Sequence, residues 1–348
     1  MALRIKDVAQ AAGVSVTTVS RVLSNNGPVR DSVRERVQNA MQQLGYRPNA
    51  AARRLRSGDT ATIGLVVSDV RNPFFTEVSR AVEDMAYRQG MRVILCNTDE
   101  NPEKEAMYLR LMEEERVTGM IYSPTRDAAE RFRAAHYPFP VVMIDRADAA
   151  SHADAVTLDN RAAAERLTLH LIEQGHRHIF ALFGNASTTG RERHAGYCDA
   201  MQRHGLDTDA VFVEPQPAQA QQAVGARLAA QAAQAAHPGG APAPGAILAS
   251  NGLLLLGAFR ALREMRAAHA GEAGAPHRAA PALCGFDNDA WTELVEPGIT
   301  VIAQPVYEIG RCAMTLLSER IAQPDTPRST RVLPGELIIR GSSLATAA

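Results

Sequence analysis

The chain has 348 residues and a formal net charge of −1, but the charge is unevenly distributed. Residues 1–58 contain ten Arg or Lys and three acidic residues, a net charge of +7, which leaves −8 for the remainder. A basic end on an acidic body indicates that any nucleic-acid contact is confined to that end. The length excludes one small core and suits a small domain followed by one or two larger ones.

The cysteines and the N-terminus indicate the compartment. The four cysteines show no CxxC or Cys/His spacing, which argues against a disulfide framework and a zinc site. The N-terminus lacks a signal-peptide pattern, and no apolar run approaches the length of a membrane span. We therefore expect a soluble protein with reduced thiols in the cytoplasm, without a metal or a cofactor.

Two short amphipathic helical patterns lie on either side of Gly13. In each pattern apolar residues recur at helical spacing, first Ile5, Val8, Ala9 and Ala12, and then Val19, Val22 and Leu23. Ser15 is placed as the N-cap of the second helix, and Gly13 supplies the left-handed backbone of a tight turn. This pattern predicts a helix-turn-helix, whose second helix enters a DNA major groove. On spacing alone, a helical hairpin without a role in DNA binding is the alternative.

A third amphipathic helix is predicted over residues 31–44, and Pro48 prevents it from continuing. The alanine-rich stretch 49–58 favours helix but is marginal alone in water, so we expect it to order on DNA. An exposed leucine among arginines suits a wedge in a minor groove beside phosphate-binding cations. These residues are Arg53, Arg54, Leu55 and Arg56, and a basic linker with an incidental leucine is the alternative.

Beyond residue 58, short apolar strands alternate with amphipathic helices, which predicts parallel sheets covered on both faces. A first set of strands is expected at 62–67, 92–96, 119–122 and 141–144, with helices at 74–89, 102–115 and 127–136. A second set follows residues 155–158, with strands at 178–183, 211–213, 246–249, 282–284 and 300–302. Its helices are expected at 161–174, 189–204, 218–235, 252–266 and 306–321. Together they form two consecutive doubly wound units, in which ligands bind at the carboxyl ends of the strands.

Two stretches have the composition of insertions. Residues 214–245 are rich in Ala, Gln and Pro, and residues 267–281 are rich in Ala, Gly and His. We interpret the first as a long helix with a loose loop and the second as a solvated loop, because composition alone carries no mechanism. A partner-binding role for either stretch is the alternative.

Several motifs together resemble the lactose/galactose-repressor (LacI/GalR) family of transcriptional regulators. In the N-terminal part they are Asp7-Val8-Ala9, Gly13-Val14-Ser15, the run from Thr18 to Leu23, and Gly45-Tyr46-Arg47-Pro48-Asn49. Further along they are Ile63-Gly64-Leu65-Val66, Asn72-Pro73-Phe74-Phe75, Cys96-Asn97-Thr98, Val117-Thr118-Gly119 and Gly285-Phe286-Asp287-Asn288. The resemblance covers nearly the whole chain. One departure is Arg4, where such proteins usually carry a Thr or Ser cap, a change worth roughly 1 kcal/mol of helix stability.

The resemblance implies an all-α helix-turn-helix domain at 1–48, a hinge helix at 49–58 and a two-lobed α/β domain like the periplasmic binding proteins at 59–348. Lobe 1 would comprise about 61–158 and 299–322, and lobe 2 about 159–290 and 329–345. It also implies a homodimer, possibly a tetramer, that binds a near-palindromic operator. A small-molecule effector between the lobes would control this repressor, which would act in the bacterial cytoplasm and associate with the nucleoid when bound to DNA.

By the same resemblance, the second helix carries the DNA-reading residues. Val16 and Thr17 would contact base edges, and Arg21 a base or a phosphate. Contacts to phosphates, which set register rather than sequence, are expected from Ser15, Thr18 and Asn25. A solvated polar position is the alternative for each of them.

The effector candidates are polar and aromatic residues at predicted strand ends: Asn72, Phe74, Asp145, Arg146, Arg193, Asn251 and Asp287. Arg193 and Asp287 match family positions that hold hydroxyls or an anionic group, whereas a purely structural role for these charges is the alternative. Gly252 stands where many members carry Asp. Residues 285–311 resemble the gluconate and ketogluconate regulators, and Arg146 next to Arg193 would suit a carboxylate. We expect a sugar acid, with a neutral or phosphorylated sugar as alternatives.

Catalytic patterns are missing from the sequence. It contains no GxSxG, no HExxH and no Gly-rich phosphate loop, so we expect no enzyme. The rival interpretations are a periplasmic-type sugar-binding protein, an enzyme of carbohydrate metabolism, and an architectural DNA-binding factor that ignores small molecules. The first is disfavoured by the basic N-terminal part, and the second by the lack of a nucleophile or an acid/base pair.

Overall fold

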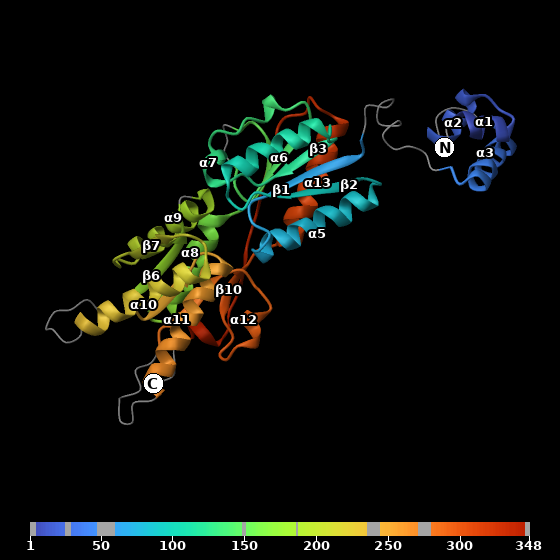
Figure 1. Ribbon diagram of the computed structural model, residues 1–348. Coiled ribbons are helices and arrows are strands. Elements are labelled where there is room, and N and C mark those ends of the chain that lie inside the picture. The colour runs from blue at the N-terminus through green and yellow to red at the C-terminus, as the bar shows by residue number, and fades with distance from the viewer. Residues whose placement is uncertain are drawn as a thin grey trace. The chain divides into compact units, whose positions relative to one another are not determined.

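The computed structural model of the chain divides by its internal contacts into two compact units, Met1–Thr60 and Ala61–Ala348, which we call the head and the body (Figure 1). It describes residues 5–24, 29–46, 60–147, 151–185, 187–234, 244–270 and 280–344. Several predicted features lie outside these residues. They are Arg4, Asn25, the hinge helix at 49–58 with Arg53, Arg54, Leu55 and Arg56, and parts of both insertions.

The head contains the predicted helix-turn-helix, followed by a third helix. Helices α1 (Ile5–Ala12), α2 (Val16–Ser24) and α3 (Asp31–Leu44) pack around the buried side chains Val8, Ala9, Ala12, Val19, Val22, Val37 and Ala40. Gly13 adopts a φ of +64° in the turn, and the Ser15 hydroxyl accepts the backbone N–H of Thr18 at 3.1 Å. The residue pattern therefore produces the fold for the reasons expected: a glycine turn, a side-chain cap and one apolar face per helix.

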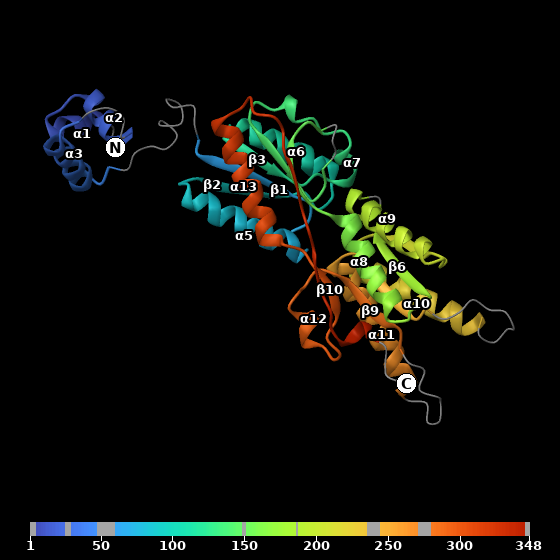
Figure 2. The same ribbon diagram turned by 180° about the vertical axis from the view of Figure 1, so that it is seen from behind.

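The body is built from two sheets, one in each lobe (Figures 1 and 2). The first has the order β11-β5-β4-β3-β1-β2 and is parallel throughout, and the second has the order β12-β10-β9-β8-β6-β7, with only β12 antiparallel among the described strands. The first sheet comprises β1 (Thr62–Val67), β2 (Arg92–Asn97), β3 (Gly119–Tyr122), β4 (Val141–Ile144), β5 (Asp154–Leu158) and β11 (Thr330–Leu333). The second comprises β6 (Ile179–Gly184), β7 (Asp209–Val213), β8 (Ala246–Ala249), β9 (Ala282–Phe286), β10 (Thr300–Ala303) and β12 (Glu336–Ile338).

Helices cover both faces of each sheet, which explains the continuous apolar strands. In the first lobe, α5 (Pro73–Arg88) and α13 (Val306–Ala322) pack on one face, and α6 (Pro102–Glu114), the short α7 (Arg126–Ala129) and η1 (Ala134–His136) belong to the other side. In the second, α8 (Asn160–Glu173) and α9 (Thr188–Arg203) cover one face, and α10 (Pro217–Gln234) and α11 (Gly252–Ala270) the other. The short α12 (Trp291–Leu294) and η3 (Gly341–Ser343) complete this lobe.

The two lobes repeat one topology. The order β2-β1-β3-β4-β5 in the first sheet corresponds to β7-β6-β8-β9-β10 in the second. The chain passes between the sheets after β5, between β10 and α13, and again between β11 and β12, so the lobes are joined by several segments. Equivalent loops of the two lobes therefore place their residues at the same edge of each sheet.

The fold class is confirmed, but the predicted lobe boundaries are wrong near the C-terminus. Residues 299–322 do not return to the first lobe as a unit, because β10 pairs with β9 in the second sheet and only α13 packs on the first. Residues 329–345 do not all belong to the second lobe either, because β11 pairs with β5. A short apolar strand fits either sheet, so its pattern alone does not specify its partner.

The predicted helix at 127–136 is also wrong. Only α7 and the single turn η1 form there, because Phe132 leaves the helical path and enters an aromatic cluster. Its ring centroid lies 4.7 Å from that of Tyr122 and 5.3 Å from that of Tyr137. Tertiary packing thus overrides a helix-favouring sequence. The first insertion contains the expected helix, α10, and α11 extends to Ala270, four residues into the stretch predicted as a loop.

The packing of α8 on α9 generates a stability prediction. A Cβ at Gly196 would lie 2.1 Å from the carbonyl oxygen of Arg161, so Gly196→Ala should force the helices apart and cost about 1–3 kcal/mol. Gly225→Ala in α10 is the matched control, because a Cβ there meets nothing within 4 Å and alanine favours helix. Urea unfolding of both variants measures the difference. Equal stabilities would contradict the close approach of the two helices.

Candidate functional site

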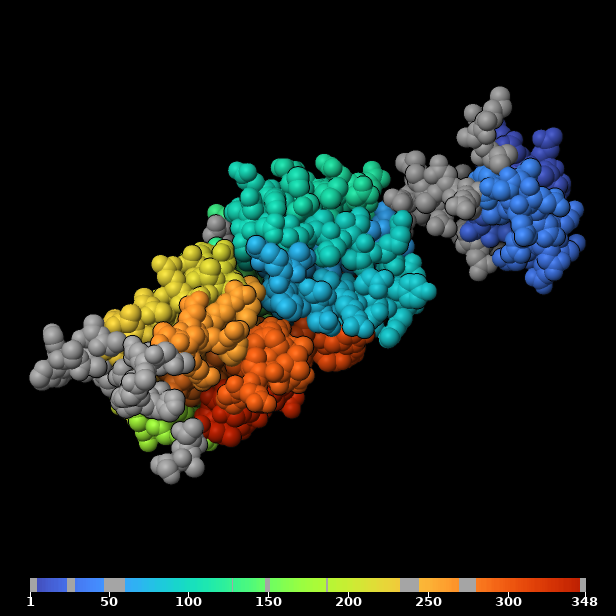
Figure 3. Space-filling view, turned by 60° about the horizontal axis from the view of Figure 1, so that its bottom comes forward, coloured from blue at the N-terminus to red at the C-terminus, as the bar shows by residue number. Residues whose placement is uncertain are grey.

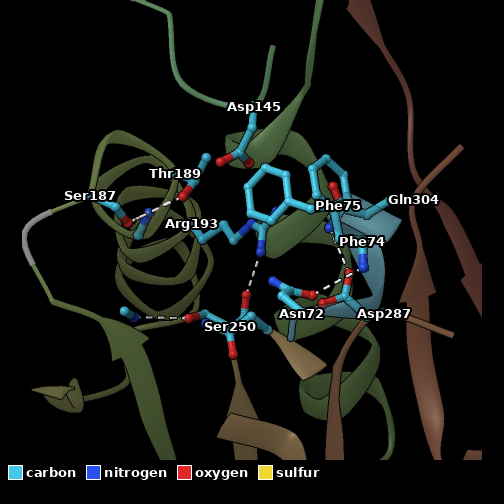
Figure 4. A pocket seen from close by; sticks show the side chains of 13 residues that line it. Asn72, Phe74, Phe75, Asp145, Ser187, Thr189, Arg193, Ser250, Asp287 and Gln304 are labelled. Carbon is cyan, nitrogen blue, oxygen red and sulfur yellow. Dashed lines mark hydrogen bonds between the residues drawn. The ribbon is translucent and has the colours of Figure 1, made fainter. Parts of the chain in front are cut away.

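A cavity of about 50 Å³ lies where the two lobes of the body meet (Figure 4). In the space-filling view of Figure 3 the outer surfaces of the two lobes are in contact. Its walls are the loops that follow the carboxyl ends of strands in both sheets, the usual ligand position in doubly wound folds. The lining residues are Asn72, Phe74, Phe75, Asp145, Gly184, Ser187, Thr189, Gly190, Arg193, Ser250, Asn251, Asp287 and Gln304. Most of them are polar, and the aromatic pair comes from the first lobe alone.

Arg193, on α9, is the basic residue of this cavity wall, and it is 4% exposed. Its Nε donates to the Asn160 Oδ1 at 2.8 Å, its Nη1 donates to the carbonyl oxygen of Ser250, and its guanidinium lies 4.1 Å from the ring centroid of Phe286. These three contacts are all with neutral groups of the second lobe. Burial lowers the pKa of Arg193, and the negative charges of Asp287 and Asp145 oppose that effect.

The two cavity carboxylates occupy equivalent positions in the two lobes. Asp145 directly follows β4 with a φ of +63°, and Asp287 directly follows β9 with a φ of +75°. Aspartate is among the residues that tolerate this left-handed backbone, which turns each chain sharply at the sheet edge. Figure 4 shows Arg193 extending between Asp145 and Ser250.

Different partners hold the two carboxylates. Asp287 Oδ2 accepts the backbone N–H of Gly252 at 2.8 Å, and its Oδ1 accepts the Gln304 side-chain amide at 2.6 Å. Burial raises the pKa of Asp145, whereas the charges of Arg146 and Arg193 act in the opposite direction. Asp287 is therefore fixed by neutral donors within its own lobe, and Asp145 depends on neighbouring cations for its charge.

The opposite wall supplies an apolar surface. Phe74 and Phe75 begin α5, and their ring centroids are 5.0 Å apart in an edge-to-face arrangement. Asn72 caps this helix by accepting the backbone N–H of Phe74 at 3.1 Å. Aromatic rings on one side and fixed donors and acceptors on the other suit a ligand with both hydroxyl groups and C–H faces.

Six of the seven predicted effector residues line this cavity, and Arg146 does not. Arg146 Nη1 donates to Glu100 Oε1 at 2.6 Å and to the carbonyl oxygen of Pro124 at 3.1 Å, so its guanidinium is engaged within the first lobe. The geometry gives no support to its predicted role as a carboxylate ligand. The Nε of Arg146 does lie 3.4 Å from Asp145 Oδ2, but the hydrogen bonds of its Nη1 direct the guanidinium to Glu100 and Pro124 rather than into the cavity.

Sequence reasoning missed several lining residues: Phe75, Ser187, Thr189, Gly190, Ser250 and Gln304. Ser187 was the most accessible to prediction, since it caps α9 by accepting the backbone N–H of Gly190 at 3.0 Å directly after a strand–loop turn. Gln304 falls within the range 299–322 predicted for the first lobe, and only the pairing of β10 places it beside Asp287.

In the head, the predicted reading residues lie together at the start of α2. Ser15, Val16, Thr17 and Arg21 are exposed, and Thr18 is half-buried with its hydroxyl 2.9 Å from that of Ser15. The buried face of the same helix holds Val19 and Val22 in the core of the head. One helix thus presents an apolar face to its own domain and a short polar face with one cation to solvent. No helix in the described part of the chain is long and apolar enough to span a bilayer.

Comparison with known proteins finds a family match for the head and another for the body. Residues 4–49 match the family described as bacterial regulatory proteins, lacI family, and residues 60–339 match periplasmic binding proteins and the sugar binding domain of the LacI family. The regulator PtxS of Pseudomonas aeruginosa is 33% identical over 97% of this chain and 95% of its own.

Two solved structures show the same fold. A lac repressor dimer bound to operator and an anti-inducer superposes with a TM-score of 0.84 at 24% identity, covering 99% of this chain and all of the other. A LacI family transcriptional regulator from Enterococcus faecium with bound ribose gives 0.66 at 25% identity, covering 82% of this chain and all of the other. The chain therefore belongs to the lacI family of bacterial regulatory proteins, as a DNA-binding transcriptional regulator with an effector-binding domain.

Proposed function

We propose that this regulator represses genes of carbohydrate breakdown as a cytoplasmic homodimer on a near-palindromic operator, and that a neutral polyhydroxylated effector controls it. The observation that carries the effector assignment is the charge of the cavity wall. One guanidinium, Arg193, shares the wall with two carboxylates, Asp145 and Asp287. Such a set donates to and accepts from hydroxyl groups, and its net charge is negative.

A neutral sugar is favoured over the sugar acid expected from the resemblance of residues 285–311. A sugar carboxylate in this cavity would meet two carboxylates and a single cation, and the second cation that it would need, Arg146, is paired with Glu100. The E. faecium regulator with bound ribose supplies a family example with a neutral ligand. The cavity is smaller than typical ligand sites of roughly 300 Å³ or more, so the lobes must separate to admit the effector.

The DNA contacts follow from the exposed face of α2. Val16 and Thr17 lie at its N-terminal end, where a recognition helix meets base edges, and Arg21 lies one turn further along. Ser15 and Thr18 would contact phosphates, together with Asn25. Arg53, Arg54 and Arg56 remain proposed phosphate contacts, and Leu55 remains the proposed minor-groove wedge.

A homodimer is supported by the edge of the first sheet. Strand β2 is the edge strand there, and Leu95 on it is 49% exposed. An uncovered apolar edge strand is a natural surface for a second copy, and two-fold symmetry would match a palindromic operator. A tetramer has no support from these residues.

Substitutions on α2 should separate base reading from positioning. Thr17→Ala should change the preferred base at one symmetric pair of operator positions, because it removes a contact to a base edge. Thr18→Ala, the matched control on the same helix, should weaken binding to all sequences alike. Selection of binding sites from a random DNA pool with each variant measures this. Identical preferences for Thr17→Ala and the wild type would remove Thr17 from the reading residues.

A thermal-shift panel tests the effector class. Neutral pentoses and hexoses should raise the unfolding temperature of the full chain, and the corresponding aldonic acids should not, because a ligand that binds the native state stabilises it. Arg193→Ala and Asp287→Ala should each abolish the shift while operator binding persists.

The matched control for these variants is Arg203→Ala. Arg203 lies on the same helix as Arg193 but pairs with Glu165 at the surface, so the shift should survive. A larger shift with aldonic acids than with neutral sugars would contradict the proposed effector class. A shift that survives Arg193→Ala would remove that residue from the site.

A further inference from the structure

A series of side chains with alternating charge extends from the cavity to the contact between the lobes. It begins at Asp145, whose Oδ2 lies 3.4 Å from the Nε of Arg146. Arg146 Nη1 donates to Glu100 Oε1 at 2.6 Å, and the other carboxylate oxygen of Glu100 accepts the backbone N–H of Arg126 at 3.1 Å. The Arg126 Nη1 then donates to Glu214 Oε1 at 3.0 Å. Successive side chains along this path therefore alternate in charge.

The last contact of this series, between Arg126 and Glu214, joins the two lobes. Arg126 begins α7 of the first lobe, whereas Glu214 directly follows β7 of the second. Arg126 Nη1 also donates to the carbonyl oxygen of Asn185 at 3.3 Å, and the Asn185 amide donates to Glu214 at 3.3 Å. One guanidinium thus binds the loops after two neighbouring strands of the second sheet. A second ion pair, Arg191 with Glu130 at 2.9 Å, joins the lobes nearby but is largely exposed.

Two features of the first lobe position Glu100 and Arg126 in this series. Asp99 and Glu100 are consecutive residues with positive φ, +51° and +55°, an uncommon backbone that directs Glu100 toward both arginines. The buried carboxylate of Glu105 accepts both the backbone N–H and the hydroxyl of Thr125, at 2.7 and 2.8 Å. Thr125 precedes Arg126, so this arginine starts from a fixed backbone and presents its side chain to the second lobe.

We propose that Asp145, Arg146, Glu100, Arg126 and Glu214 form a charge relay that couples occupancy of the cavity to closure of the lobes. A ligand hydroxyl that donates to Asp145 weakens the pull of that carboxylate on Arg146. Arg146 then pairs more fully with Glu100, which frees Arg126 to pair with Glu214, so the lobe contact tightens. Neither Arg126 nor Glu214 lines the cavity, and they act as positioning residues.

The inference rests on the proposed control of the cavity by an effector, but its test uses neither effector nor DNA, so the two proposals fail independently. Spin labels at Met107→Cys on α6 and Gln202→Cys on α9 report the distance between the lobes by pulsed electron resonance. Both positions are exposed. The background carries Cys198→Ser, because the other three cysteines are buried. Labelled protein is diluted tenfold with unlabelled protein, so that distances within one protomer dominate.

In the relay as proposed, the parent protein gives one narrow distance distribution at low salt, which broadens in 1 M NaCl. Glu214→Gln and Arg126→Ala each shift the ratio of closed to open protein by roughly two- to five-fold, the range of a partly exposed ion pair. The double variant matches the single variants, because both remove the same contact. Glu165→Gln is the matched control, since it breaks the ion pair with Arg203 within one lobe and leaves the distribution unchanged.

Two results would contradict different steps of the proposal. Distributions for Arg126→Ala and Glu214→Gln that coincide with the parent would show that the contact does not hold the lobes. A shift with Glu214→Gln but none with Glu100→Gln would show that the contact acts alone, without the link to Asp145. In the relay Glu100 competes with Glu214 for Arg126, so a Glu100→Gln distribution shifted toward the closed form, opposite to that of Glu214→Gln, supports the relay as a unit.

Discussion

The arrangement of the cavity depends on one buried cation. Arg193 lies between the lobes with an amide oxygen, a backbone carbonyl and an aromatic face as its contacts, and a desolvated guanidinium is costly unless charge or polar groups surround it. Asp287 of its own lobe and Asp145 of the other supply the opposing charge, and both support its protonated form. The position of the lobes relative to each other therefore enters the electrostatic free energy of this residue, which makes the cavity sensitive to lobe closure.

Repetition of one topology explains how the required groups come together. Because each lobe uses the same strand order, the residue after its fourth strand reaches the same sheet edge, and in both lobes that residue is an aspartate with left-handed backbone. The lobes then differ in what surrounds each aspartate. Neutral donors fix Asp287, whereas Asp145 faces two arginines, and this asymmetry is the reason that the proposed relay begins at the first-lobe carboxylate.

Much of this architecture could be predicted from the sequence, because helical and strand periodicities are local. The helix-turn-helix follows from the spacing of apolar residues around Gly13, Arg193 and Asp287 follow from their places in motifs, and Asp145 follows from its place at a predicted strand end. Predictions failed where a long-range choice decides the outcome. The sheet that β10 and β11 join, the unwinding forced by Phe132, and the engagement of Arg146 by Glu100 all depend on residues distant in the chain. Such choices leave no periodic signal.

The central claim is that one effector site in the body controls DNA binding by the head, and thermodynamic reciprocity tests it most directly. Isothermal titration calorimetry measures the sugar Kd in the absence and in the presence of operator DNA. With the neutral sugar that gives the largest thermal shift, we expect saturating operator DNA to change the sugar Kd by the same factor by which the sugar changes the operator Kd. A sugar Kd that operator DNA leaves unchanged would contradict the account.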